Sequence, residues 1–228
     1  EGSDTVSIVP VDAHSGEFMW WSNRSDESDT RLTRAFDLTG VETATLRFWT
    51  WYHIEDGWDY AYVTVSTDGE RWTPLESARM STDDPHSNAY GPGYTGQSGG
   101  WVEESIDLTP YAGQEIMVRF EYITDDAVTQ PGLILDDISV PEIGYFEDFE
   151  SSDGGWQSEG WLRMNNHLPQ DFLVQLIQPA NEEAPVTRLL GPGERSGEWT
   201  ITTSGASVDT VLVVSGLAPV TTEPARFT

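Results

Sequence analysis

Apolar and polar residues alternate with a period of two along most of the chain. In DYAYVTVSTDGERWTPL (59–75), Ala61, Val63 and Val65 alternate with their neighbours, and a turn containing glycine follows. Such alternation is typical of strands with one buried face, and the turn indicates a hairpin. Further strand-like runs are TATLRFWTWYHI (43–54), WVEESIDL (101–108), EIMVRFEYIT (115–124) and LILDDISV (133–140). No window combines a helical stripe of useful length with a cap, so the sequence predicts an all-β sandwich.

The second part of the chain contains shorter strand-like runs. An acidic, glycine-bearing connection, YFEDFESSDGGW (145–156), follows the last strong strand. The shorter runs after it cover residues 156–164, 172–179, 186–190, 198–204 and 209–217. We therefore expect one β-sandwich over residues 1–142 and a smaller immunoglobulin-like β-sandwich over 143–228. The alternative is that the tail packs back onto the first pair of sheets.

Composition restricts the partners of this chain. It carries 39 Asp and Glu against 11 cationic residues, all of them Arg, and its net charge is −28. Such a surface repels nucleic acid and anionic membranes, and it favours divalent cations or saline surroundings. The plainer interpretation is a solvated acidic surface without a ligand. The absence of cysteine excludes disulfides and thiolate metal sites, and no apolar run is long enough for membrane insertion.

Several stretches of the sequence resemble a known family. They are HSGEFMWWSNRSDESDTRLTRAFDLTGVETATLRFWTWYHIEDGWDYAYVTVS (14–66), the run 95–140 that ends in LDDISV, and residues 146–177. The most specific motif is Trp-Tyr-x-Ile-Glu-x-x-Trp-Asp-Tyr, from Trp51 to Tyr60. Together these stretches resemble the region that follows the catalytic domain in immune inhibitor A-type secreted metallopeptidases, and LDDISV is shared with MAM-type jelly rolls.

The resemblance implies a jelly-roll sandwich of MAM or lectin-like type over residues 1–142. It also implies an extracellular location, an upstream zinc peptidase domain in the same polypeptide, and an association with calcium. The peptidase motif itself is His-Glu-x-x-His, in which two histidines one helical turn apart hold zinc. The four histidines here are far apart in sequence, and none is followed by Glu. We therefore expect a non-catalytic region with no zinc in this chain.

Two acidic motifs are candidates for a calcium site, because calcium takes six to eight oxygen ligands. YHIEDGWDY (52–60) supplies Glu55 and Asp59, and LILDDISV supplies Asp136 and Asp137. Consecutive strand residues face opposite sides, so one of the latter pair is expected to point inward and to need a partner. That partner is a structural calcium ion shared with Glu55 and Asp59, or else one of the arginines Arg47 and Arg119 in core-like strands. Plain solvent exposure is the third alternative.

The ten tryptophans and eight tyrosines suit either core packing or stacking on a ligand. The candidates for ligand contacts stand at the ends of strands or in the long strand-free stretch 79–100. They are Trp58, Tyr90, Tyr94 and Trp101. Core packing is the commoner role for any single aromatic residue.

These observations favour a calcium-stabilised accessory region of a secreted metallopeptidase-like protein. It would brace the peptidase domain or bind an extracellular protein or glycan surface, without nucleic acid and without insertion into a membrane. The alternative is a stand-alone extracellular carbohydrate-binding or adhesion module. A third interpretation, a glycan-active enzyme, would require a selected pair of carboxylates, and no motif in this sequence selects one.

Overall fold

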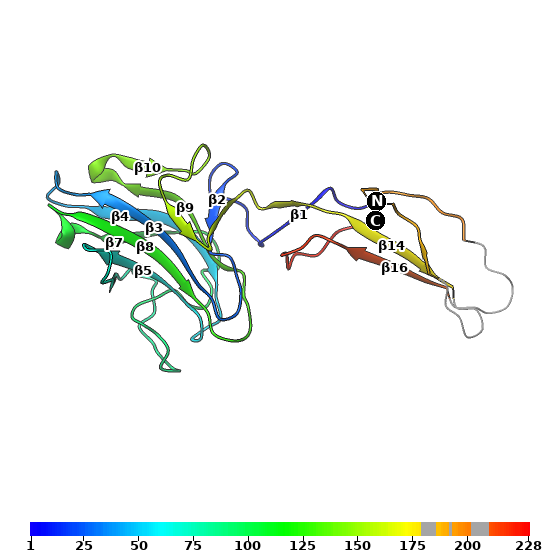
Figure 1. Ribbon diagram of the computed structural model, residues 1–228, viewed down its shortest axis with the longest axis horizontal. Helices are drawn as coiled ribbons and strands as arrows, with labels where there is room; N and C mark the ends of the chain where they lie inside the picture. Colours follow the sequence, from blue (N-terminus) through cyan, green and yellow to red (C-terminus); the bar gives the residue numbers. More distant parts are fainter. Residues whose placement is uncertain (179–185, 192, 202–209) are drawn as a thin grey trace. The chain divides into compact units, whose positions relative to one another are not determined.

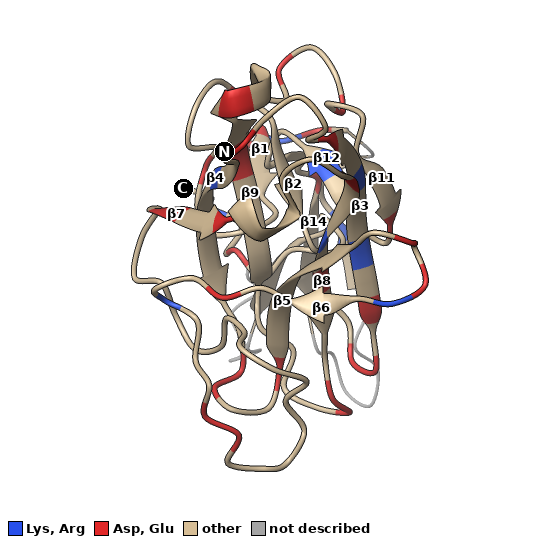
Figure 2. Cartoon of the chain, turned by 90° about the vertical axis from the view of Figure 1, so that its left-hand side faces the viewer, with Lys and Arg blue, Asp and Glu red and all other residues tan. Residues whose placement is uncertain are grey.

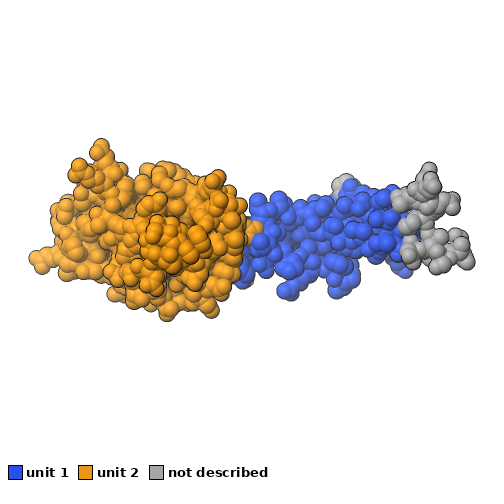
Figure 3. All heavy atoms as spheres, turned by 90° about the horizontal axis from the view of Figure 1, so that it is seen from below, with its two compact units in different colours: residues 1–11, 166–228 blue, residues 12–165 orange. Residues whose placement is uncertain are grey.

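The computed structural model describes residues 1–178, 186–191, 193–201 and 210–228. The chain divides into two compact units, of which unit 1 comprises residues 1–11 and 166–228 and unit 2 comprises residues 12–165 (Figure 3). All paired strands run antiparallel (Figure 1), which confirms the all-β prediction. The helical segments among the described residues are two 3-10 turns, Thr109–Tyr111 and Pro141–Ile143. None of the helices described could cross a membrane.

Unit 2 consists of two facing antiparallel sheets. The first has the order β12-β2-β9-β4-β7, with β10 paired to the end of β9, and the second has the order β11-β3-β8-β5-β6. The strands of the first sheet are β2 (Met19–Trp21), β4 (Thr45–His53), β7 (Val102–Asp107), β9 (Gly132–Val140), β10 (Tyr145–Glu147) and β12 (Leu162–Met164). Those of the second are β3 (Asp29–Asp37), β5 (Tyr60–Ser66), β6 (Thr73–Pro74), β8 (Glu115–Ile123) and β11 (Gln157–Glu159).

The order of the strands along the chain identifies the sandwich as a jelly roll. The chain passes from β2 to β3, β4 and β5, and so changes sheet at each step. After β6 the chain again changes sheet at each step, through β7, β8 and β9. In the first sheet β9 lies between β2 and β4. Within these sheets, four strands of the first (β2-β9-β4-β7) and four of the second (β3-β8-β5-β6) are connected as the double Greek key of a jelly roll. The jelly-roll prediction is therefore confirmed.

The alternation in the sequence accounts for the core between the sheets. Every second residue of β4 is buried, while the residues between them are more exposed. The buried residues are Leu46, Phe48, Thr50 and Tyr52. Phe48 meets Phe120 of the opposite sheet edge-to-face, with ring centroids 5.0 Å apart. Such aromatic pairs contribute about 0.5–1.5 kcal/mol beyond the area that they bury. The alternating runs 43–54 and 115–124, which form β4 and β8, therefore supply the centre of the sandwich.

The strands that follow residue 142 belong to both units. β10, β11 and β12 add to the edges of the jelly-roll sheets, and Trp156 and Trp161 are buried in the jelly-roll core. The boundaries between compact units therefore fall at residues 11–12 and 165–166, whereas the sequence analysis places a domain boundary at 142–143. Burial of two large indoles explains why this stretch stays with the first sandwich. Residues 143–165 thus pack onto the first pair of sheets, whereas residues 166–228 belong to unit 1.

Unit 1 joins the two ends of the chain. β1 (Thr5–Ser7) pairs with β13 (His167–Pro169), and a second sheet has the order β15-β14-β16. Its strands are β14 (Phe172–Ile177), β15 (Val186–Arg188) and β16 (Val211–Gly216). Its small buried cluster contains Phe172, Val174 and Leu190. Of the strand predicted at 198–204, residues 198–201 are not in a strand, and residues 202–204 lie outside the described part of the chain.

Candidate functional site

The turn between β4 and β5 places the carboxylates of Glu55 and Asp59 close to each other. The carbonyl oxygen of Glu55 accepts hydrogen bonds from the backbone amides of Trp58 and Asp59, at 3.3 and 3.1 Å. Gly57 has a φ of 75° in this turn, and a Cβ at that position would lie 2.9 Å from Cγ of Pro85. Glycine is therefore required here both by the left-handed backbone and by the close approach of the 79–100 stretch.

Asp125 completes a cluster of three carboxylates. It stands just after β8, and β8 pairs with β5 so that Ile123 is opposite Tyr60. Carboxylate oxygens of Glu55, Asp59 and Asp125 all lie within 4.8 Å of one another. Asp59 is 1% exposed, whereas the other two are half-buried. This register brings together side chains that are about 70 residues apart.

The buried carboxylate of Asp59 is only partly hydrogen-bonded. One oxygen accepts a hydrogen bond of 2.8 Å from the backbone amide of Asp125, and Oδ2 has no hydrogen-bond partner. The Tyr122 hydroxyl lies beside this carboxylate and favours its charged form, but it too lacks a hydrogen bond of normal geometry. A buried acceptor without a partner is costly, which makes Oδ2 an open ligand position.

The electrostatics of the cluster also favour a cation. Burial raises the pKa of Asp59 to about 6, and the charges of Asp125 and Glu55 add to the increase. Burial and Asp125 likewise raise the pKa of Glu55. Arginine-bearing stretches lie instead along β3 (Figure 2), and none of the ion pairs among the described residues involves these three carboxylates. Oxygen ligands alone suit a hard cation such as calcium rather than zinc.

Asp136 and Asp137 lie elsewhere, in the middle of β9. Asp136 is fully buried and accepts hydrogen bonds from the backbone amides of Ser15 and Asp137, at 3.1 and 2.8 Å. Burial raises its pKa to about 7, against the opposing effect of the Ser15 amide. Asp137 lies 2.6 Å from Nδ1 of His14 and accepts a 2.8 Å hydrogen bond from the Ser15 hydroxyl. The pair therefore fastens residues 14–15 to the sheet and does not join the Glu55–Asp59–Asp125 cluster.

A β-bulge explains the orientation of this pair. The register between β4 and β9 shifts so that Trp49 is opposite Asp136 while Arg47 is opposite Ser139. Asp137 has a φ of 48°, in the left-handed region. The expected alternation of the two carboxylates is therefore broken, and both contact the same segment. Neither arginine considered as a partner is used, because Arg119 interacts with Glu121, at 3.8 Å, and Arg47 forms no ion pair with either aspartate.

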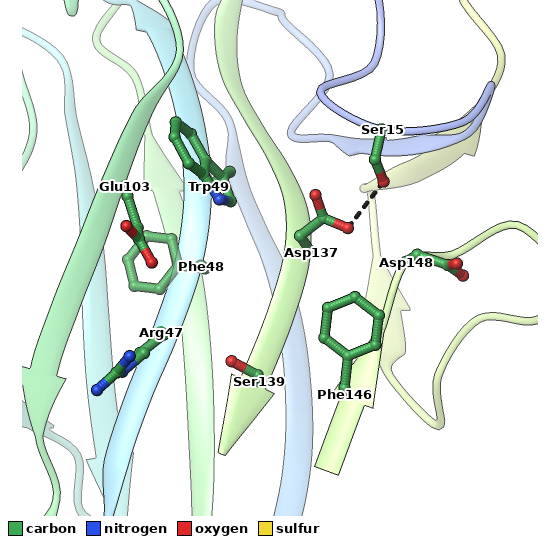
Figure 4. Close-up of a pocket in the computed structure, with 9 residues that line it drawn as sticks. All are labelled: Ser15, Arg47, Phe48, Trp49, Glu103, Asp137, Ser139, Phe146 and Asp148. Carbon is green, nitrogen blue, oxygen red and sulfur yellow. Dashed lines mark hydrogen bonds between the residues drawn. The ribbon is translucent and has the colours of Figure 1, made fainter. Parts of the chain in front are cut away.

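A shallow cleft of about 390 Å³ lies beside Asp137 on the outer face of the first sheet. Figure 4 shows Trp49 and Arg47 on β4, Glu103 on the neighbouring strand, and Phe146 on the far side of Asp137. The Trp49 ring stacks on His14 with centroids 3.8 Å apart. One face of the indole is therefore already covered by the protein itself.

The four aromatic residues predicted to contact a ligand have different environments. Trp58 and Tyr90 are 42% and 73% exposed and line one small cleft of about 150 Å³. Tyr94 is fully buried in the core, and its hydroxyl interacts with Ser77 and Glu104. Trp101 donates its indole N–H to the carbonyl of Asp12. Trp58 and Tyr90 are thus brought together, whereas Tyr94 packs inside the sandwich.

Asp125 and Asn88 are not among the site residues predicted from the sequence. Asn88 lines the same cleft as Trp58 and Tyr90, and its amide donates a 2.7 Å hydrogen bond to the carbonyl of Trp58. A signal for Asp125 was available, because Asp125-Asp126 directly follows the run EIMVRFEYIT. Polar residues at a strand end are candidates for a loop-borne site.

The fold and the site together define a class: a jelly-roll sandwich that carries an acidic cluster on its connecting loops. The chain belongs to the family described as immune inhibitor A-like, MAM domain, whose model matches residues 3–165. This match covers the whole of unit 2. The resemblance stated from the sequence is therefore confirmed.

Named relatives agree with this assignment. The pre-pro-metalloprotease PrtV of Vibrio cholerae serotype O1 is 32% identical over 167 residues, which cover 70% of this chain and 17% of that protein. Immune inhibitor A of Bacillus thuringiensis subsp. alesti is 28% identical over 140 residues, covering 61% of this chain and 19% of that protein. Bacillopeptidase F of Bacillus subtilis is 34% identical over 94 residues, covering 41% and 5%. The chain thus spans less than a fifth of each relative.

Proposed function

We propose that this chain is a non-catalytic accessory region of an extracellular peptidase-like protein. It braces the peptidase domain of the same polypeptide or holds that domain on an extracellular surface. The observation that supports this proposal is the family match over residues 3–165. The separate alignment with the metalloprotease relative covers only 17% of that protein. An accessory domain of a longer polypeptide accounts for both.

Calcium is the proposed structural cofactor, held by Glu55, Asp59 and Asp125. Three carboxylates within 4.8 Å of one another supply part of the six to eight oxygen ligands that calcium takes. The unpartnered Oδ2 of Asp59 supports this assignment. A bound cation would neutralise the mutual repulsion of the cluster and would fix the β4–β5 turn against the end of β8. Asp136 and Asp137 were expected to share this ion, but their oxygens are engaged by residues 14–15.

The bracing role is tested on the full-length polypeptide that contains this chain. We would compare it with a variant lacking residues 12–165, the whole of unit 2, and measure casein hydrolysis before and after heating. The expected result is that both forms hydrolyse casein at first, whereas the deleted form is inactivated sooner or no longer binds its surface. A full-length polypeptide without any peptidase domain would overturn the proposal in favour of a stand-alone adhesion or carbohydrate-binding module.

A further inference from the structure

A small cleft rimmed by aromatic residues adjoins the carboxylate cluster. It lies between the β4–β5 turn, the 79–100 stretch and the residues after β8, and its volume is about 150 Å³. Tyr60 and Tyr62 form its buried floor, with nearly parallel rings 5.9 Å apart. Trp58 and Tyr90 form the exposed rim. Two large exposed aromatic rings at one opening are unusual on a surface this polar, because such rings are normally covered.

The protein holds both rim residues in place. Trp58 stacks on His86 with ring centroids 3.6 Å apart, which leaves one indole face for other contacts. The Tyr62 hydroxyl accepts a 3.0 Å hydrogen bond from the backbone amide of Tyr90, whose ring packs edge-on against that of Tyr62. The rim is thus ordered in advance, which reduces the entropy lost when a ligand binds.

The polar groups of the cleft are mainly hydrogen-bond acceptors. The amide nitrogen of Asn88 is used by the carbonyl of Trp58, and its Oδ1 is buried without a hydrogen-bond partner. Asp125 lines the cleft and also belongs to the carboxylate cluster. A suitable ligand therefore donates hydrogen bonds through several hydroxyls and presents an apolar face to an aromatic ring. Sugars have both properties, whereas an anion would be repelled by the acidic surroundings.

We propose that this cleft binds one sugar unit of a glycan in a calcium-dependent manner. The sugar ring packs against Trp58 or Tyr90 and its hydroxyls donate to the carboxylate of Asp125, while Asn88 forms part of the wall of the cleft and holds the Trp58 backbone. The inference rests on the proposed function, because the calcium ion held by the cluster fixes the position of Asp125 between the ion and the sugar. Its small volume suits a single unit at the end of a chain rather than an extended polysaccharide.

The test uses the complete 228-residue chain on an array of mono- and oligosaccharides, in calcium and in a chelator. Binding to a subset of glycans in calcium, lost in chelator, is expected. Tyr90→Ala should weaken that binding about tenfold or more, because it removes an aromatic contact at the rim. Asn88→Ala, which removes the hydrogen bond to the Trp58 carbonyl and part of the cleft wall, is a second variant and should also weaken binding. Phe146→Ala is the matched control, since Phe146 is 62% exposed and lies outside this cleft, and it should change nothing.

Each of the following results would overturn the inference. They are the absence of glycan binding, binding that survives either Tyr90→Ala or chelation, and binding that only Phe146→Ala removes. Tetramethylammonium is tested in parallel by NMR, because an aromatic cleft with a carboxylate can also hold a quaternary ammonium ion; its binding in place of glycans would likewise overturn the inference. A melting temperature that rises with calcium in the absence of glycan binding would refute the sugar site and leave the proposed cation site standing.

Discussion

Replacing Asp59 with asparagine should stabilise the protein when calcium is absent. Burial raises the pKa of this carboxylate from its ordinary 3.8 to about 6. A difference of about two pKa units corresponds to about 3 kcal/mol that the charged form costs the folded state at pH 7. Asparagine is neutral and nearly the same size, and its carbonyl oxygen can still accept the hydrogen bond from Asp125 that Asp59 accepts at 2.8 Å. Asp59→Asn should therefore raise the free energy of unfolding by up to about 3 kcal/mol.

The sign of the pH dependence follows from the raised pKa. Between pH 4 and 6, roughly, the folded state keeps a proton on Asp59 that the unfolded chain has lost, so stability falls as pH rises through this window. The contribution of Asp59 is thus most favourable below about pH 4 and is lost above about pH 6. Asp59→Asn removes this contribution. The difference between the native protein and the variant isolates Asp59 from other groups, such as Asp136, that titrate in the same protein.

Calcium should cancel the advantage of the variant. A ligand that binds only the folded state stabilises it by about 2.7 kcal/mol at a hundredfold excess over its Kd. The native protein gains this energy through Asp59, whereas the variant has lost a charged ligand and gains much less. The two proteins should therefore be of similar stability in calcium and clearly different in chelator.

The assay is urea unfolding at several pH values between 4 and 8, with calcium or with chelator. Tryptophan fluorescence reports unit 2 because every tryptophan except Trp199 lies in residues 12–165. The reasoning is refuted if Asp59→Asn destabilises the chelated protein at pH 7. It is equally refuted if the effect of the substitution is the same with and without calcium.

Three further substitutions test other parts of unit 2. Asp136→Ala leaves the backbone amide of Ser15 without its acceptor and should lower the free energy of unfolding by about 1–3 kcal/mol in urea titrations; an unchanged midpoint would contradict the role assigned to this carboxylate. Gly57→Ala should cost more than Gly113→Ala, because both glycines have positive φ, at 75° and 80°, but only Gly57 is crowded, by Pro85. Thermal melts should show a loss of about 1 kcal/mol from the backbone alone at Gly113 and a larger loss at Gly57; equal losses would mean that Pro85 moves aside.

The sequence was sufficient to predict most of the jelly roll. The alternation in 43–54 and 59–75 corresponds to β4 and β5, and the run LILDDISV corresponds to most of β9. The alternation predicts a strand with one buried face, which is a local property, and β4 has such a face. β5 is buried at all seven positions, because the 79–100 stretch contacts Tyr60 and Tyr62 from outside the sandwich. The position of residues 143–165 depends instead on the burial of Trp156 and Trp161 in the jelly-roll core. The local pattern of the sequence does not predict this long-range packing. The division between units therefore differed from the expected boundary.

The candidate site was only partly accessible from the sequence. Glu55 and Asp59 share one turn, so their proximity is local, but Asp125 reaches them only through the pairing of β5 with β8. Asp137 does not follow the alternation of strand residues, because a β-bulge shifts the register between β4 and β9. The local sequence does not predict that bulge. Tyr94 stands in a stretch that looks like an exposed loop, yet its backbone pairs with Ala61 and its ring enters the core. Contacts between distant segments thus decided which predicted residues came together.

The pairing of β1 with β13 has a consequence for the order in which this protein is made. Thr5 pairs with Pro169, so the whole of unit 2 is synthesised between two strands that are neighbours in unit 1. Domains generally fold as units while the ribosome is still adding residues. The jelly roll is complete in sequence by residue 165 and can fold while β1 still lacks its partner. β1 therefore pairs with β13 only after the whole of unit 2 has been synthesised.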